Sequence, residues 1–149
     1  MDQDKLISDL QLDEGWKSYL YDDANGKPVV PGYTLIGHPT ICWGFALDVS
    51  PFTMTEAMPI LERRAAQKWT ELQASLPWVG VLPENIQRAI TNMAYQMGNG
   101  GLLKFNTFLS LLQAGKYNEA ADDLESTAWY RQSGERGPRI QALIKEGVE

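Results

Sequence analysis

One segment, residues 84–97, constrains the fold more than any other. Its apolar side chains recur at intervals of three and four residues and form a nearly continuous stripe: Ile86, Ala89, Ile90, Met93, Ala94 and Met97. This spacing is typical of one face of an α-helix. Gly98 follows directly, and glycine is favoured just beyond a helix end. We therefore predict that residues 84–97 form the central and most buried helix of the protein.

Helical signals extend over the whole chain from residue 53 onward. Thr53 and Glu56 have the spacing of a capping box, in which two side chains satisfy free N–H groups at a helix start. Pro59 fits poorly inside a helix that begins there, so Thr55 is an alternative N-cap that leaves the proline in the first turn. This helix is expected to end near Ser75. Shorter helices are predicted at residues 106–114, 117–126, 128–132 and 137–146.

The N-terminal third is different. Its first fifteen residues predict one helix that ends at Gly15. Glycines and prolines then punctuate short β-rich pieces, with a hairpin-turn signal at Asn25-Gly26. These pieces are Val29-Val30, Tyr33–Ile36 and Thr40–Trp43. We expect a small antiparallel sheet there, and hence a mainly helical α+β fold with its sheet confined to one lobe.

Length and composition bound the possible functions. A chain of 149 residues is expected to form a single domain, with a helix at 1–15, a β lobe at 16–50 and a helical lobe at 51–149. The net charge of −6 argues against nucleic acid as a partner. The single cysteine, Cys42, excludes an internal disulfide, and no Cys/His cluster suggests zinc, so neither a metal nor a cofactor is expected.

The N-terminus is acidic, and no apolar run is long enough for a signal core or a membrane span. We therefore expect synthesis in a cytoplasm, without a signal peptide and without stable membrane insertion. No heptad pattern demands a dimer, so a monomer is expected.

Two carboxyl groups are candidates for catalysis. Glu14 lies at a helix end beside Trp16, and Asp23 follows eight intervening residues later at the predicted edge of the sheet. Two carboxyls in different environments are what cleavage of a glycosidic bond requires. Desolvation beside the tryptophan would keep Glu14 protonated as a general acid. The alternatives are a surface glutamate and, for Asp22 and Asp23, ordinary turn residues.

Several further residues are candidates for supporting roles in such a site. The hydroxyl of Thr40 can donate and accept at once, so it can hold a water beside an aspartate, although its β-propensity alone also explains it. Arg136 and Arg139 lie three residues apart, and either can pair with a carboxylate or remain in solvent. Residues 96–101 read as a helix stop that can line a cleft.

Together these residues resemble a known family, the bacteriophage-type lysozymes of glycoside hydrolase family 24, in their endolysin branch. The resemblance covers essentially the whole chain, in order. The segments that carry it are Glu14-Gly15 with Tyr21-Asp22-Asp23, Pro39–Gly44, Leu76-Pro77-Trp78, Ala89–Gly98, and Trp129-Tyr130 with Arg136 and Arg139. It implies a lysozyme-like fold with a cleft between two lobes.

The resemblance also implies a set of roles. Glu14 would be the general acid, Asp23 the carboxylate across the cleft, and Thr40 its helper in placing the attacking water. Arg136 would neighbour the acid, and the supporting residues would be Tyr21, Gln96 and Met97. The implied substrate is peptidoglycan, cut between N-acetylmuramic acid and N-acetylglucosamine. Inversion at the anomeric carbon would require about 6.5–9.5 Å between the two carboxyls.

The chain departs from the family pattern in three respects. Sixteen residues separate Asp23 from Thr40, more than is usual, so the segment from about Lys27 to His38 is expected to form either a lip over the cleft or a surface elaboration. Cys42 and Phe45 replace a glycine and a polar residue. The chain is also acidic, which weakens its attraction to anionic cell walls.

The resemblance favours an active enzyme that lyses bacterial cells from within, because a binding relic would not need glutamate, aspartate, threonine and arginine together. The alternatives are a catalytically inactive glycan-binding or virion structural relative, and a hydrolase for a chitin-type polymer. Without a signal peptide, release to the periplasmic cell wall would depend on a holin, or the protein would travel in a virion.

Overall fold

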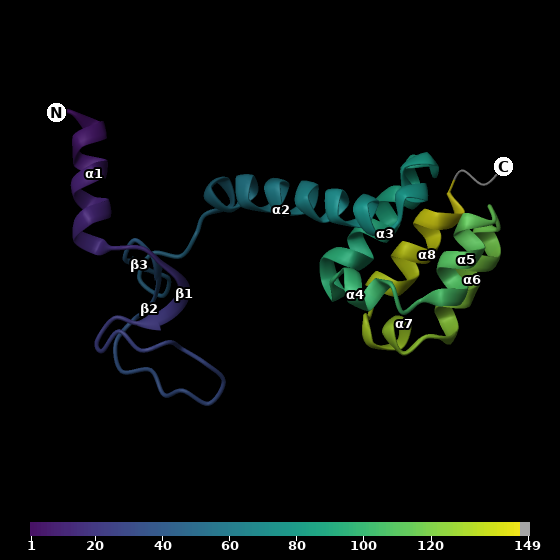
Figure 1. The fold of residues 1–149 in the computed structure, drawn as a ribbon. Coiled ribbons are helices and arrows are strands. Elements are labelled where there is room, and N and C mark those ends of the chain that lie inside the picture. The colour runs from purple at the N-terminus through teal and green to yellow at the C-terminus, as the bar shows by residue number, and fades with distance from the viewer. Residues whose placement is uncertain (147–149) are drawn as a thin grey trace. The chain divides into compact units, whose positions relative to one another are not determined.

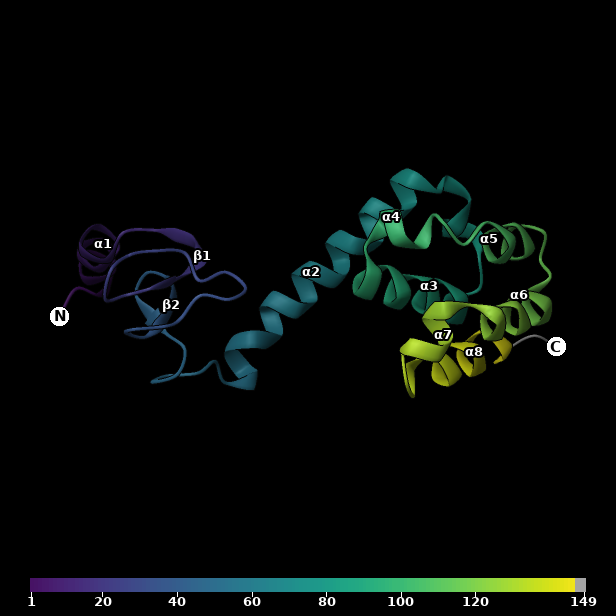
Figure 2. The same cartoon turned by 90° about the horizontal axis from the view of Figure 1, so that it is seen from below.

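The computed structural model describes residues 1–146, which form two compact units. The first is Met1–Met58 and the second begins at Pro59 (Figure 1). The protein is mostly helical, with one small antiparallel sheet, as Figure 2 also shows, so the predicted α+β class is confirmed. We describe each unit by itself, and the predicted cleft between lobes stays a prediction.

The first helix, α1 (Gln3–Glu14), has clear signals at both ends. The carboxylate of Asp2 accepts a hydrogen bond from the Lys5 N–H at 3.2 Å and caps the N-terminus. At the other end, Gly15 has φ of 66° and donates its N–H to the Gln11 carbonyl at 3.2 Å. Glycine adopts this positive φ without strain, which ends the helix directly after Glu14.

The sheet has three strands in the order β1 (Lys17–Asp22), β2 (Pro39–Cys42) and β3 (Phe45–Ala46), all antiparallel. Its register places Tyr21 opposite Thr40, and Thr40 opposite Ala46. The predicted strand at Thr40–Trp43 is confirmed in β2, whereas the two-residue strand β3 was not predicted.

Two of the predicted β pieces are wrong. Neither Val29-Val30 nor Tyr33–Ile36 forms a strand, and only an isolated bridge joins Pro28 to Tyr21. Proline has no N–H to contribute to a ladder, and the chain carries one at position 28 and one at position 31. The N–H of Ile36 donates a hydrogen bond to the Asp22 carboxylate at 2.7 Å and not to a neighbouring strand. The segment between β1 and β2 is therefore an irregular loop.

A tight turn joins β2 to β3. Cys42 has φ of 59°, and it is the only residue other than glycine with a positive φ among residues 1–146. Gly44, two positions on, has φ of 73°. Glycine adopts such a left-handed conformation without strain, and other residues rarely adopt it.

The long helix α2 (Met54–Ser75) begins with the predicted capping box. The Glu56 carboxylate accepts hydrogen bonds from the N–H and hydroxyl of Thr53 at 2.8 and 2.7 Å, and the Glu56 N–H donates to the Thr53 hydroxyl at 3.3 Å. Thr53 is the cap, so the alternative start at Thr55 is wrong. Pro59 consequently lies inside the helix, where it has no N–H to donate to the preceding turn.

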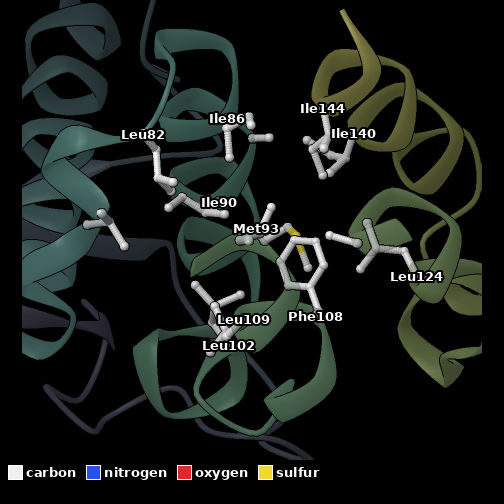
Figure 3. Close-up of a cluster of buried hydrophobic side chains, with 14 of the residues drawn as sticks. Leu82, Ile86, Ile90, Met93, Leu102, Phe108, Leu109, Leu124, Ile140 and Ile144 are labelled. Carbon is white, nitrogen blue, oxygen red and sulfur yellow. The ribbon is translucent and has the colours of Figure 1, made fainter. Parts of the chain in front are cut away.

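The second unit packs around α3 (Glu84–Met97), as predicted. Five of its six predicted stripe residues are buried, and Met97 is partly buried at the end. Figure 3 shows these side chains meeting others from the helices that follow. Those later elements are α4 (Asn99–Leu102), α5 (Asn106–Gln113), α6 (Tyr117–Asp123), η2 (Leu124–Ser126), α7 (Ala128–Gln132) and α8 (Arg136–Lys145).

The unpredicted elements of this unit are short. The 3₁₀ helix η1 (Pro77–Val81) lies between α2 and α3, and α4 occupies the glycine-rich stretch that was expected to be a helix stop alone. Among residues 1–146, no helix combines the length and apolar composition that crossing a bilayer requires.

Candidate active site

Glu14 is the last residue of α1, and the β2–β3 turn lies against its side chain. A Cβ atom added at Gly44 would overlap the Oε2 atom of Glu14 and lie 2.9 Å from its Cδ atom. The positive φ of 73° at this position favours glycine, and the absence of a side chain lets the Glu14 carboxyl approach its Cα atom closely. Gly44 therefore brings the end of α1 and the turn of the sheet together at the carboxyl group.

Two tryptophans make a second contact between the same elements. The rings of Trp16, just after α1, and Trp43, in the β2–β3 turn, have centroids 4.5 Å apart and planes inclined by 52°. Aromatic pairs at such distances stabilise beyond the area that they bury. Trp16 remains 56% exposed and the Glu14 side chain is exposed, so burial of Glu14 beside the tryptophan stays a prediction.

Tyr21 lies on the same sheet, opposite Thr40, and is buried. The Lys17 ammonium nitrogen lies 3.8 Å from the centroid of its ring. Burial raises the pKa of the Tyr21 phenol, and the negative charges of Glu14 and Asp23 raise this pKa further. The phenol therefore remains neutral, within electrostatic range of both candidate carboxylates.

Asp23, directly after β1, is held by the backbone N–H and the backbone carbonyl of His38. Its Oδ1 atom accepts a hydrogen bond from the His38 N–H at 2.7 Å, and its own N–H donates to the His38 carbonyl at 3.2 Å. Within residues 1–146, its Oδ2 atom accepts no hydrogen bond from the protein. One oxygen is therefore fixed in position, and the other remains free to bind water.

The Thr40 hydroxyl and the Asp23 N–H share the His38 carbonyl as their hydrogen-bond acceptor. Its hydroxyl donates to the His38 carbonyl at 3.1 Å, and the residue is 2% exposed. The hydroxyl oxygen keeps its capacity to accept a hydrogen bond. The structure thus brings Asp23 and Thr40 together through the backbone of His38, despite the sixteen residues between them in sequence.

Asp22 is the residue that sequence reasoning missed. The sequence left it open between a turn residue and a carboxylate that orients water, but its side chain is fully buried and each carboxylate oxygen accepts two hydrogen bonds. The donors are the N–H groups of Ala24 at 3.0 Å, Ile36 at 2.7 Å and Gly37 at 2.9 Å, and the Tyr33 hydroxyl at 3.0 Å.

These donors also determine the charge of Asp22. Burial alone would raise its pKa, but the hydrogen bonds from Ile36, Ala24, Tyr33 and Gly37 outweigh burial and lower the pKa below its usual value. Asp22 is therefore ionised at neutral pH. Donors that lie up to fifteen residues away and belong mostly to the backbone leave no pattern in the sequence, so nothing there could have indicated this role.

The remaining predicted residues belong to the second unit. Gln96 accepts a hydrogen bond from the indole N–H of Trp129 at 2.9 Å. Met97 and Trp129 line a cavity of about 760 Å³, together with Phe105. Arg136, at the start of α8, lines another cavity of about 590 Å³ in the same unit. The roles predicted for Gln96, Met97 and Arg136 in supporting Glu14 and Asp23 stay predictions.

No metal site accompanies these groups. Over the described part of the chain, residues 1–146, no three His, Cys, Asp or Glu side chains are placed to hold an ion.

A helix-end glutamate against a sheet turn, with an aspartate just after one strand and a threonine on the neighbouring strand, fits the site of a lysozyme-type glycosidase. The phage lysozyme family matches residues 12–146. The chain belongs to this family, and the family resemblance drawn from its sequence is confirmed.

Relatives come from a phage and from an amoeba. The chain is 29% identical to the pre-baseplate central spike protein Gp5 of Enterobacteria phage T4, over 93% of this chain but only 27% of that protein. It is 26% identical to the probable T4-type lysozyme 1 of Dictyostelium discoideum, over 93% of this chain and 92% of that protein. A second probable lysozyme of the same organism is 33% identical over 45% of the chain.

Proposed function

We propose that the protein is a muramidase that hydrolyses the bond between N-acetylmuramic acid and N-acetylglucosamine in bacterial peptidoglycan. The observation that carries this proposal is the grouping in the first unit: Gly44 lies against the Glu14 carboxyl, and Asp23 and Thr40 both bond the backbone of His38. Membership of the phage lysozyme family supports it.

In the proposed reaction, protonated Glu14 donates its proton to the glycosidic oxygen as the bond to the anomeric carbon breaks. The electron pair of that bond remains on the leaving oxygen, which becomes a hydroxyl. A water molecule attacks the anomeric carbon from the opposite face. Asp23 accepts its proton through the free Oδ2 atom, and Thr40 orients the water, so the configuration inverts.

The other residues support these steps. Tyr21, as a neutral phenol, can donate a hydrogen bond to either carboxylate or to the substrate. We assign Arg136 to holding the acid, and Gln96 and Met97 to contacting the glycan. Gln96 is itself oriented by the Trp129 indole.

Replacing the acid tests the proposal directly. Purified protein should lower the turbidity of outer-membrane-permeabilised Gram-negative cells, and Glu14→Gln should slow this at least about 100-fold, because the amide has no proton to give. Glu14 is exposed, so its melting temperature should hardly change. Asp13→Asn, a matched exposed carboxylate one position earlier, should remain active. Wild-type lysis by Glu14→Gln would contradict the assignment.

The similarity to a phage spike protein favours a second setting for the same activity, in a virion rather than free in the infected cell. In the first setting a holin would release the enzyme to the wall. Mass spectrometry of fragments released from peptidoglycan would identify the bond that is cut. Binding without release of fragments would favour a glycan-binding relative, and preferential release of N-acetylglucosamine oligomers from chitin would favour a chitin-type hydrolase.

A further inference from the structure

The loop between Asp23 and Thr40, residues 24–39, is folded around Asp22. Three of its backbone N–H groups and the Tyr33 hydroxyl donate to this one buried carboxylate. Asn25 reinforces the arrangement, since its side-chain amide donates to the Tyr33 hydroxyl at 2.8 Å and its side-chain oxygen accepts from the Lys27 N–H at 2.8 Å. The loop is therefore a specific structure with a polar centre.

Three consecutive N–H groups of this loop are divided between two neighbouring carboxylates. Those of Ile36 and Gly37 donate to Asp22 at 2.7 and 2.9 Å, and that of His38 donates to Asp23 at 2.7 Å. Successive peptide units are rigid planes joined at single Cα atoms. A carboxylate that holds the N–H groups of residues 36 and 37 therefore fixes the peptide plane just before the Gly37 Cα atom, and only the two backbone rotations of Gly37 separate this plane from the His38 N–H.

Gly37 shows how closely this loop approaches the site. A Cβ atom at this position would overlap the Oδ1 atom of Asp23 and lie 2.8 Å from the Cβ atom of Ala24. The loop backbone thus packs directly against the side of Asp23 that accepts the His38 hydrogen bond. Any displacement of residues 36–38 would move the Asp23 carboxylate with it.

We propose that Asp22 is a positioning residue, which uses the loop of residues 24–39 to hold the His38 N–H against Asp23 and so fixes the carboxylate that activates water. This proposal rests on the proposed function of Asp23. It gives the loop a role in the chemistry, in place of a lip over the cleft or a surface elaboration.

The charge of Asp22 is what suits it to this task. An ionised carboxylate only accepts hydrogen bonds, and here it faces four donors. An asparagine side chain has nearly the same shape, but one of its two positions is an N–H₂ group that would face two donors. Asp22→Asn therefore replaces one of the two acceptor oxygens with a donor group, removes the negative charge and leaves the size of the side chain nearly unchanged.

The test compares Asp22→Asn with the wild type by two independent measurements. In the first, kcat on soluble peptidoglycan fragments should fall about 10–100-fold with little change in KM, because misplacement of a catalytic group by about 1 Å costs this much. In the second, the NMR signal of the His38 amide should shift, and its hydrogen exchange should become faster, in the absence of substrate. Asp9→Asn, an exposed carboxylate on α1, is the matched charge control and should change neither.

Milder variants keep the proposal testable if Asp22→Asn does not fold. Tyr33→Phe removes one of the four donors and should lower kcat less than Asp22→Asn. Gly37→Ala leaves the donors in place but pushes residues 36–38 away from Asp23, and should lower kcat with little change in KM. An unchanged kcat in both variants would overturn the proposal.

Two outcomes separate this proposal from the proposed function. A folded Asp22→Asn variant with an altered His38 amide but wild-type kcat would overturn the positioning role, while lysis that depends on Glu14 would still stand. If Glu14→Gln and Asp23→Asn were both fully active, the proposed function would fail, even though the His38 amide still responded to Asp22→Asn.

Discussion

The two units of this protein are stabilised by different kinds of interaction. In the described residues, every buried apolar side chain except that of Tyr21 lies in the second unit, whereas both buried polar side chains, Asp22 and Thr40, lie in the first. The second unit is thus a conventional helical core, and the first is organised around hydrogen bonds to a buried charge. The candidate catalytic carboxylates lie in the polar unit, where hydrogen bonds impose direction and apolar packing does not.

The largest expected effect is on the stability that the apolar core gives to the second unit. Phe108 is fully buried on α5 within the cluster of Figure 3. Phe108→Ala should lower the free energy of unfolding by about 3–5 kcal/mol, because it removes apolar contacts and leaves a cavity. Denaturant unfolding followed by circular dichroism would measure this change.

A matched surface truncation provides the control. Val81→Ala, at a side chain that is 87% exposed, should change the free energy of unfolding by less than about 0.5 kcal/mol. In native Phe108→Ala protein the His38 amide signal should stay at its wild-type position, because the hydrogen bonds around Asp22 and Asp23 all lie within the first unit. A shifted His38 signal would show that the polar network depends on the apolar core of the second unit.

The two units also differ in how much of their structure the sequence predicts. The helix at residues 84–97 and the Thr53–Glu56 capping box depend on neighbours three and four positions away, so their patterns are visible in one chain. The roles of Glu14, Asp23 and Thr40 were suggested by the order of short motifs. The structure adds the Gly44 and His38 contacts between them, which connect residues far apart in sequence.

The loop of residues 24–39 resisted prediction for a physical reason. Its valines and aromatic residue favour strands, but the polar groups of its backbone have a stronger partner in the buried Asp22 carboxylate. Which carboxylate of the Asp22-Asp23 pair would be buried also depended on the register of β1 with β2. Neither fact can be read from residue types alone.

A smaller effect on stability is expected at Cys42, which has a positive φ at the β2–β3 turn. Cys42→Gly should raise the free energy of unfolding by about 0.5–1 kcal/mol, since relief of the left-handed conformation exceeds the extra chain entropy that glycine loses on folding. Cys42→Ala, which keeps a Cβ atom, should give no such gain. Equal stability of Cys42→Gly and Cys42→Ala would show that the turn bears no strain at this position.

The smallest expected effect concerns the side chain of His38, the only histidine of the chain. Its Nδ1 atom lies 2.9 Å from a carboxylate oxygen of Asp48. The hydrogen bond and charge of Asp48 raise the pKa of His38 above 6.5, and the charges of Asp23 and Asp22 raise this pKa further. The stabilisation is therefore fully present below pH 6.5 and is lost as the pH rises through the raised pKa of the folded protein.

Asp48→Asn tests this interaction, because it keeps the shape of the side chain and removes the charge. The wild-type melting temperature should fall between about pH 6 and pH 8, relative to that of Asp48→Asn, since histidine titrates in this range. The pKa of Asp48 is lowered in turn by the His38 hydrogen bond, so the same stabilisation should also disappear in acid as that carboxylate is protonated. Parallel melting curves for the two proteins across this range would mean that the pair contributes nothing. The polar organisation of the first unit would then rest on its buried carboxylate and not on its exposed charges.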